Sequence, residues 1–398
     1  MTKNKDVKRT FLACYSGIFT QAAVLNLPPL FYVIYTTDLA LSLSFVAILP
    51  TLIFGLQIIV DATFSKLIAK IGYKKTAVFA DTFSIIGLTI LGLTPFLNAP
   101  EVTIICSTVL CAVGSGMIEI TTSPLIEALE TENKSATMSL MHSFYCWGHF
   151  AVVILTTAFL WAFGKNYWFV LPFIAAIIPI LSACFYLSIK KIHTLEEQGC
   201  SNKFSDFGKN KIFFLLVGLM ICAGASEQNI AQWASYFAEE GLNVSKSVGD
   251  LLGTSLFALF MALARTFFGV IGKKLSLKKA LILASAGLTV AYLITALSPL
   301  PALSLAGLAL CGVFVGITWP GVLSLSGESG LKGGTLMFAL LSLGGDIGCT
   351  LGPTLVGEIA NAASINYGVL SGTVFPVVMF ILLLIYSRSV TLHPNDHL

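Results

Sequence analysis

Eight of the ionisable residues in the long apolar stretches of this sequence are candidates for function, because a charge is unfavourable there. They are Asp61, Asp81, Glu119, His142, His149, Glu227, Arg265 and Asp346. A charged side chain in the core of a bilayer is destabilising, so such residues usually face a cavity or a partner. We expect Asp81 to be structural, near the cytoplasmic interface, and the others to include the functional centre.

Glu119 is the first candidate for proton coupling. It follows Gly114 and Gly116, which allow neighbouring helices to approach closely, and it precedes Pro124. Desolvation disfavours the charged form of a carboxyl group, so a buried Glu can bind and release a proton reversibly. The alternative is a protonated carboxyl group that is simply bonded to a neighbouring helix.

His142 is the second proton-coupling candidate. It shares one helical stripe with Ser139, Cys146 and His149. An imidazole that faces a cavity can relay protons. A buried neutral imidazole bonded to a carbonyl group is an equally good interpretation of the same pattern.

Polar residues with the chemistry to hold hydroxyl groups cluster in the stretch that follows Glu227. Amide side chains make paired donor and acceptor contacts to hydroxyls, and an indole ring can stack on the apolar face of a sugar. The alternative is hydrogen bonding between helices, with the rings in an interfacial aromatic belt. The substrate-binding candidates are Gln21, Asn26, Glu227, Gln228, Asn229, Gln232, Trp233, Trp319 and Asp346.

Arg265 is a basic residue well inside one of these apolar stretches, and it requires an acidic neighbour. Glu119 and Asp346 are the candidates for that neighbour. Arg265 stands 204 residues after Asp61, and we expect both to serve gating or a structural ion pair. The further gating candidates are Lys70, Gly72 and Lys74.

Twelve apolar stretches are long enough to hold these residues in membrane-spanning helices. The chain of 398 residues is 56% hydrophobic and 11% charged, which excludes an ordinary soluble domain. The expected fold is an all-α membrane protein with spans near 10–35, 43–68, 76–96, 102–129, 135–163, 167–189, 212–239, 246–272, 278–298, 300–327, 332–362 and 365–387.

Lys and Arg concentrate at one set of span ends, which predicts that both termini are cytoplasmic and that the protein lies in the cytoplasmic membrane. The chain also repeats itself. Lys70, Lys74 and Lys75 recur 204 residues later as Lys274, Lys278 and Lys279, and Leu93-Thr94-Pro95 recurs as Leu297-Ser298-Pro299. We therefore expect two parallel six-helix halves, 1–189 and 212–387, with a cytoplasmic loop at 190–211 and a tail at 388–398.

Two parallel six-helix halves resemble the major facilitator superfamily. The loop between the second and third spans is similar to that family's signature at Lys70, Gly72, Lys74 and Lys75, but Ala69 replaces its aspartate. The resemblance implies alternating access, in which the two halves rock around a site between them.

The fourth span narrows the resemblance to the fucose–proton symporter branch of that superfamily. Gly114 to Pro124 is similar to its motif G-x-G-x-x-E-T-x-x-N-P, and His142 takes the position of a glutamine in its fifth-span motif. Trp319-Pro320 and the glycine-rich segment around Asp346 also resemble the branch. The resemblance implies carbohydrate–proton symport, although Leu25 stands where the branch has a first-span aspartate.

Other classes of protein find little support in the sequence. It contains no nucleotide-binding P-loop, G-x-S-x-G or H-E-x-x-H motif, so we expect no enzyme activity, and it has no C-x-x-C pair, so we expect no metal site, disulfide framework or cofactor. The expected partners are a sugar-like solute, a proton or sodium ion, and the lipid bilayer, with no nucleic acid and a monomeric chain. The alternatives are proton-coupled efflux of drugs or metabolites, and a non-transporting membrane receptor.

Overall fold

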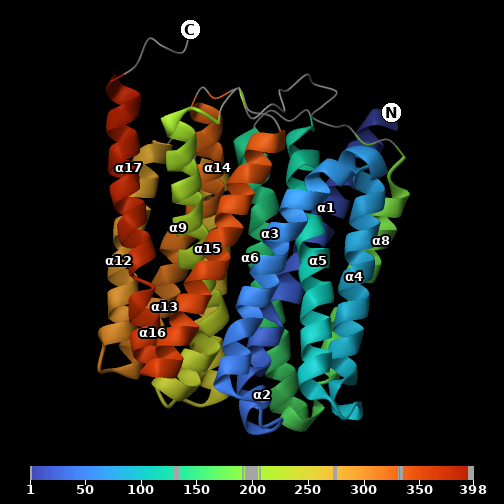
Figure 1. Cartoon of the computed structure of the whole chain (residues 1–398), viewed down its shortest axis with the longest axis vertical. Helices are drawn as coiled ribbons and strands as arrows, with labels where there is room; N and C mark the ends of the chain where they lie inside the picture. Colours follow the sequence, from blue (N-terminus) through green and yellow to red (C-terminus); the bar gives the residue numbers. More distant parts are fainter. Residues whose placement is uncertain are drawn as a thin grey trace.

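Twelve apolar helical spans run side by side along the long axis of the molecule, as the sequence predicts (Figure 1). The computed structural model describes residues 2–129, 134–190, 208–271, 276–329 and 335–392, with the single positions 192, 205 and 331. Helix α1 begins and α17 ends at the same end of the bundle, here called the terminal end. The other end is called the opposite end.

The first six spans are built from eight α-helices. Pro28 and Pro29 interrupt the first span, because proline has no backbone N–H to donate. Gly72 joins α3 to α4 at φ +88°, a conformation that glycine adopts without strain. The elements are α1 Thr2–Asn26, η1 Pro28–Phe31, α2 Tyr32–Thr37, α3 Leu43–Ile71, α4 Tyr73–Leu93, η2 Thr94–Phe96, α5 Pro100–Glu127, α6 Lys134–Phe163, η3 Lys165–Tyr167, α7 Val170–Ala175 and α8 Ile177–Ser188.

The second six spans follow after a chain segment that is largely outside the described residues. Asn210 caps α9, because its side chain accepts a hydrogen bond from the Ile212 N–H at 2.9 Å. The elements are α9 Lys211–Tyr236, the π-helical η6 Phe237–Gly241, α10 Lys246–Val248, the π-helical η7 Gly249–Ser255, α11 Leu256–Ile271, α12 Leu277–Leu297, α13 Pro301–Val315, α14 Thr318–Glu328, α15 Thr335–Ala362, α16 Ile365–Ser371 and α17 Val374–Leu392.

The two sets of six spans meet mainly where α3 packs on α15 and α6 packs on α11. Polar contacts join them towards the opposite end. The hydroxyl groups of Thr51 and Thr354 are 2.5 Å apart. Tyr32 donates to Gln232 at 3.2 Å. These contacts hold the two sets together on that side of the interface.

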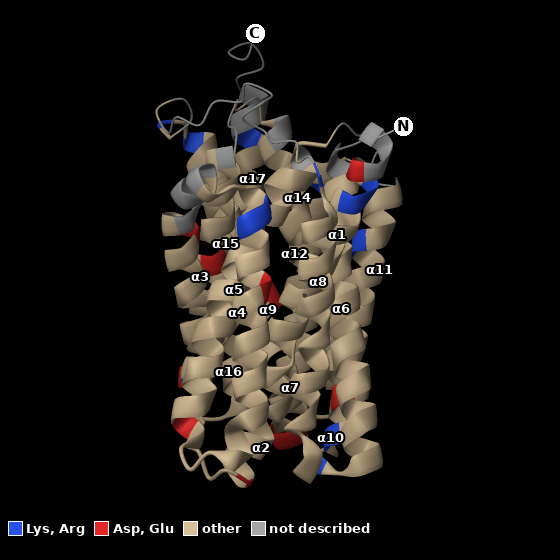
Figure 2. Ribbon diagram, turned by 90° about the vertical axis from the view of Figure 1, so that its right-hand side faces the viewer, with Lys and Arg blue, Asp and Glu red and all other residues tan. Residues whose placement is uncertain are grey.

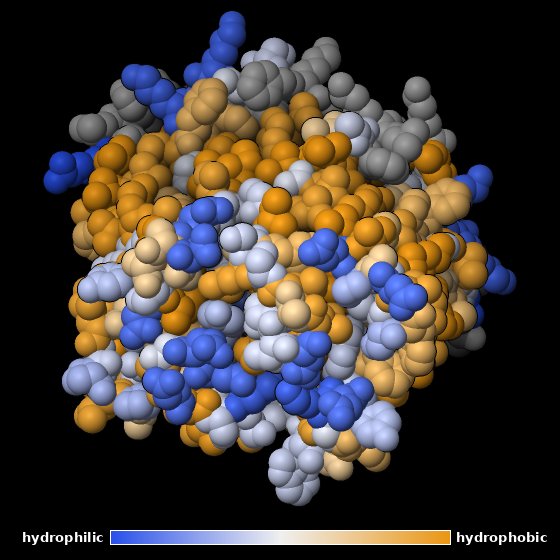
Figure 3. All heavy atoms as spheres, turned by 60° about the horizontal axis from the view of Figure 1, so that its bottom comes forward, coloured by the Kyte–Doolittle hydropathy of each residue, from blue (hydrophilic) through white to orange (hydrophobic). Residues whose placement is uncertain are grey.

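The surface has the distribution expected of a membrane protein. Lys and Arg gather at the terminal end, and few lie at the opposite end (Figure 2). Hydrophilic residues cover much of the opposite end, whereas the sides are largely hydrophobic (Figure 3). Large apolar side chains such as Val270 and Leu283 are 75% and 69% exposed. In water this exposure would be unfavourable, but it matches the hydrocarbon core of a bilayer.

Candidate functional site

A small polar cavity lies between the two sets of spans, and we call it the central cavity. Its volume of about 50 Å³ has room for one or two water molecules, each of which occupies about 30 Å³ in the liquid. Its lining comes from both sets: Gln21, Leu25, Phe54, Gln57, Glu119, His142, Tyr145, Glu227, Gln228, Arg265, Trp319, Asp346 and Cys349. Seven of the predicted proton-coupling and substrate-binding residues therefore meet at one place.

Glu119 faces this cavity from α5, and its partner comes from α1. The Gln21 side-chain amide donates to Oε2 of Glu119 at 2.9 Å. Gly114 lets α5 lie directly against α4, because a Cβ there would be 2.5 Å from Oγ of Ser84. Close packing thus fixes the height and rotation of α5, and with them the position of the Glu119 carboxyl group.

Arg265 forms a buried ion pair with Glu227, not with either acidic residue that the sequence suggested. Its Nη2 lies 2.5 Å from Oε2 of Glu227, and both side chains are almost fully buried. Arg265 also donates to the carbonyl groups of Gly316 at 2.9 Å and His142 at 3.3 Å. The guanidinium therefore links α9, α11 and α6. The expectation of Glu119 or Asp346 as its partner is wrong, because α9 brings Glu227 closer.

Asp61 and Asp346 are brought together across the interface of α3 and α15. Their carboxyl groups are close enough to interact electrostatically, and the residues are 3% and 2% exposed. Asp346 also lines the central cavity, whereas Asp61 lies behind it. The sequence singled out both residues but gave no sign that they lie close together.

Tyr145 is a lining residue that the sequence analysis missed. Its hydroxyl group accepts hydrogen bonds from the amides of Asn26 at 3.2 Å and Gln228 at 3.4 Å. Asn26 does not line the cavity itself but reaches it through this hydroxyl. Tyr145 stands three residues after His142 and so shares its helical face, a spacing that could have revealed it.

Three of the predicted substrate-binding residues, Asn229, Gln232 and Trp233, do not line the central cavity. Asn229 lies against Gly352 within the second set of spans. Gln232 contacts Gln228 and Tyr32 just beyond the cavity, and the Trp233 indole donates to the Pro353 carbonyl at 3.0 Å. The contact of Trp233 corresponds to the interhelical hydrogen bonding that was the alternative for this segment, whereas neither polar side-chain atom of Asn229 has a hydrogen-bond partner among the described residues. Glu227 and Gln228 form the face of α9 that lines the cavity.

The two histidines of α6 differ in their surroundings. His142 lines the central cavity, and its Nε2 has no hydrogen-bond partner among the described residues. His149 is 1% exposed and packs near the ring of Phe257, at 6.1 Å between centroids. Only His142 of these two is therefore placed to exchange protons with the cavity.

The gating candidates of the second-to-third loop do not contact the second set of spans in the described structure. Lys74 donates to the carbonyl groups of Leu187 and Ile189, both at 2.8 Å, and so caps the end of α8. The side chain of Lys70 lies outside the described part. Gly72 supplies the turn between α3 and α4.

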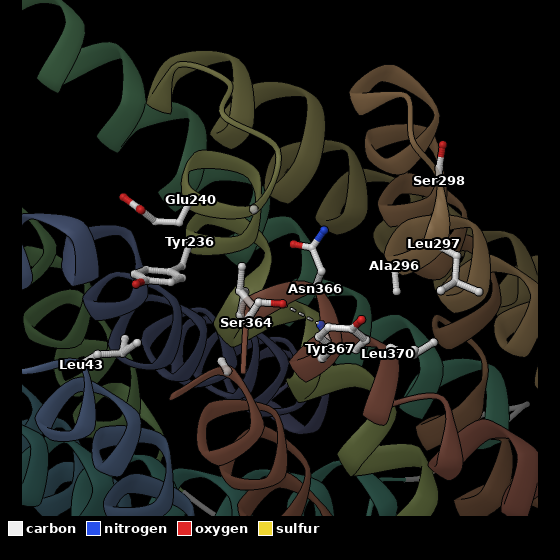
Figure 4. Close-up of a pocket in the computed structure, with 13 residues that line it drawn as sticks. Leu43, Tyr236, Glu240, Ala296, Leu297, Ser298, Ser364, Asn366, Tyr367 and Leu370 are labelled. Atoms are coloured by element: carbon white, nitrogen blue, oxygen red, sulfur yellow. Dashed lines mark hydrogen bonds between the residues drawn. The ribbon is translucent and has the colours of Figure 1, made fainter. Parts of the chain in front are cut away.

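A larger cleft opens at the opposite end of the bundle. It has a volume of about 640 Å³, within the range of small-molecule sites. It lies between Tyr236 and Glu240 on one side and the α16 residues Asn366 and Tyr367 on the other (Figure 4). The linings of this cleft and of the central cavity share no residue.

Comparisons with known proteins agree with this architecture. A family model described as Major Facilitator Superfamily matches residues 12–329 and 216–397. No curated protein matches the chain in sequence.

Two solved structures share the fold over almost their whole length. One is a variant of the E. coli fucose:proton symporter FucP, with 17% identity, a TM-score of 0.70, and coverage of 94% of this chain and 98% of that chain. The other is a Major Facilitator Superfamily transporter, FucP, in the outward conformation, with 16% identity, a TM-score of 0.72 and the same coverage. At this level of identity the likeness shows the fold.

Proposed function

Because the chain belongs to the Major Facilitator Superfamily, we propose that it moves a sugar or sugar-like polyol across the membrane together with a proton. Members of this family are transporters and not enzymes, and the twelve apolar spans make the chain an integral membrane protein. Our proposal goes beyond family membership in three respects: the class of solute, the coupling to a proton and the direction of transport. We further propose that the chain works as a monomer in the cytoplasmic membrane, with the terminal end facing the cytoplasm.

The observation that carries the proposal is the buried contact between Glu119 and Gln21 in a cavity shared by both halves. An ionised Glu119 is stabilised by the amide that donates to it, and a protonated Glu119 removes a charge from a site with little water. Proton binding therefore changes the electrostatics at the contact between α1 and α5. In an alternating-access cycle, this change would favour reorientation of the halves when both proton and solute are bound.

The remaining lining groups have the chemistry to bind a polyol. The amides of Gln21 and Gln228 and the hydroxyl of Tyr145 donate and accept hydrogen bonds, and the Trp319 indole offers a flat apolar surface. The likeness to a fucose:proton symporter supports the same class of solute. A cavity of about 50 Å³ is smaller than a sugar, so solute binding requires the halves to separate from this arrangement.

The test begins with purified protein and a panel of sugars and polyols that includes fucose. A ligand that binds the native state raises the unfolding temperature. The best ligand is then followed in proteoliposomes under an imposed pH gradient. We expect proton-driven accumulation by the native chain, and we expect Glu119→Gln to lose accumulation while it retains exchange of solute, because the amide cannot release a proton.

Glu101→Gln is the matched control, since Glu101 is an exposed residue at the start of the same helix. It should accumulate solute as the native chain does. Full accumulation by Glu119→Gln would remove the coupling role from Glu119. Failure of every sugar and polyol to stabilise the protein, with drug-like cations stabilising it instead, would favour efflux.

A further inference from the structure

Asp61 and Asp346 form a pair between the two halves of the transporter. Asp61 belongs to α3 in the first half and Asp346 to α15 in the second, and these helices pack along much of their length. The carboxyl groups lie nearer the terminal end than the hydroxyl contact of Thr51 with Thr354. Any motion that parts α3 from α15 at this level must therefore separate the two carboxyl groups.

Three of the four carboxyl oxygens of this pair are buried and have no hydrogen-bond partner among the described residues. In the described part of the chain, neither oxygen of Asp61 has a donor, and Oδ2 of Asp346 has none. Gln57 lies one helical turn from Asp61 and lines the central cavity with an equally unpartnered Oε1. The described side chains of this region thus offer the carboxyl pair acceptors and little donor capacity, which a proton on one carboxyl group would supply.

The charged and titratable groups around the pair do not supply a counter-charge. Glu119 of α5 is close enough to repel both carboxylates, and Cys349 of α15 interacts with Asp346. Glu227 of α9 and Arg265 of α11 form an ion pair with each other. His142 of α6 faces the same cavity.

Asp81 of α4 faces Ser182, away from the pair. The side chains of Lys66 and Lys70, further along α3, lie outside the described part of the chain.

Two buried carboxyl groups that face each other across packed helices without a cation are unfavourable when both are ionised, because their repulsion adds to the loss of hydration. A proton on one carboxyl group turns it into a donor to the other. We propose that Asp61 and Asp346 form a second proton site, shared between the halves, which holds one proton while α3 and α15 are in contact and releases it to water when the halves part there. This site deepens the proposed proton coupling, on which it rests, because it makes proton occupancy depend on closure of the interface.

The experiment measures the distance between the halves as a function of pH, with no solute present. Spin labels are placed at Lys75→Cys and Lys279→Cys, two exposed positions at the terminal end of α4 and α12, in a chain whose nine native cysteines are replaced. We expect the native pair to give a short distance at low pH and a longer one at high pH. Asp61→Asn and Asp346→Asn should each keep the short distance at all pH values, since the amide donates to the remaining carboxylate.

Asp81→Asn is the control, because Asp81 is fully buried but not at the interface, and it should respond to pH as the native chain does. Glu119→Gln should lose accumulation and still show the change in distance, so failure of the proposed symport and failure of this site give different results. A distance that ignores pH in the native chain, or a full response in both Asn variants, would overturn the proposal.

Discussion

Replacement of Glu227 by Leu should leave the Arg265 guanidinium buried without its carboxylate. The two groups are 2.5 Å apart, and their side chains are 6% and 3% exposed. At an effective dielectric constant of ~20, two unit charges at this distance attract by about 7 kcal/mol. Desolvation of both groups offsets part of this attraction, and loss of one partner from a buried pair typically destabilises by about 3–5 kcal/mol.

The reverse change, Arg265→Met, should destabilise less than Glu227→Leu. A carboxyl group can neutralise itself by binding a proton, whereas a guanidinium group remains charged. The double variant should be more stable than Glu227→Leu alone, because it buries no charge at this place.

Equilibrium unfolding by sodium dodecyl sulfate in mixed micelles measures these differences as a double-mutant cycle. The matched control is the exposed pair of Asp38 and Lys165 at 2.7 Å, for which Lys165→Met should cost no more than about 1 kcal/mol. The reasoning is refuted if the two single losses simply add in the double variant. It is equally refuted if Glu227→Leu destabilises no more than the control.

Three further changes test the packing, the cavity and the surface. Gly348→Ala should destabilise the protein by about 1–3 kcal/mol in the same unfolding assay, because a Cβ there would overlap the backbone of α9. Gly55→Ala is the control and should be tolerated, because a Cβ at that position has no atom within 4 Å. Tyr145→Phe removes the hydroxyl that two amides share and should weaken solute binding by about five- to tenfold in calorimetry, as loss of about 1 kcal/mol of hydrogen bonding implies. The hydrogen bond from Lys165 holds the pKa of Asp38 below its usual value. This bond therefore stabilises the fold at neutral pH, and the stabilisation is lost as the pH falls through the carboxyl range. The unfolding free energy of Lys165→Met should lack this loss at low pH.

Much of the fold could be predicted because hydropathy and charge are local properties of a chain. Each apolar stretch is long enough to cross a bilayer, and the twelve spans of the structure follow the predicted ones. The prolines at 28 and 29 marked the break in the first span. The backbone of each helix satisfies its own hydrogen bonds, so its existence does not depend on its neighbours.

The candidate site was predictable only in part. A polar group in an apolar span is unfavourable unless it faces a cavity or a partner, and this criterion selected Glu119, His142, Gln228 and Asp346. All four line one cavity. Trp233 satisfied the same criterion, but it lies away from the cavity, where its indole donates to the Pro353 carbonyl and its ring lies near that of Tyr32. Sequence spacing places residues on one face of a helix, and it does not say towards which neighbour that face is turned.

The sequence by itself determined the twelve spans, the repeat of 204 residues and the set of buried polar groups. Only the tertiary structure decided how those groups pair. Arg265 meets Glu227 because α9 and α11 lie side by side, and Asp61 meets Asp346 because α3 and α15 do. The physical reason is that a buried charge requires some partner, which composition reveals, whereas the partner's identity depends on the relative height and rotation of helices distant in sequence, which close packing sets.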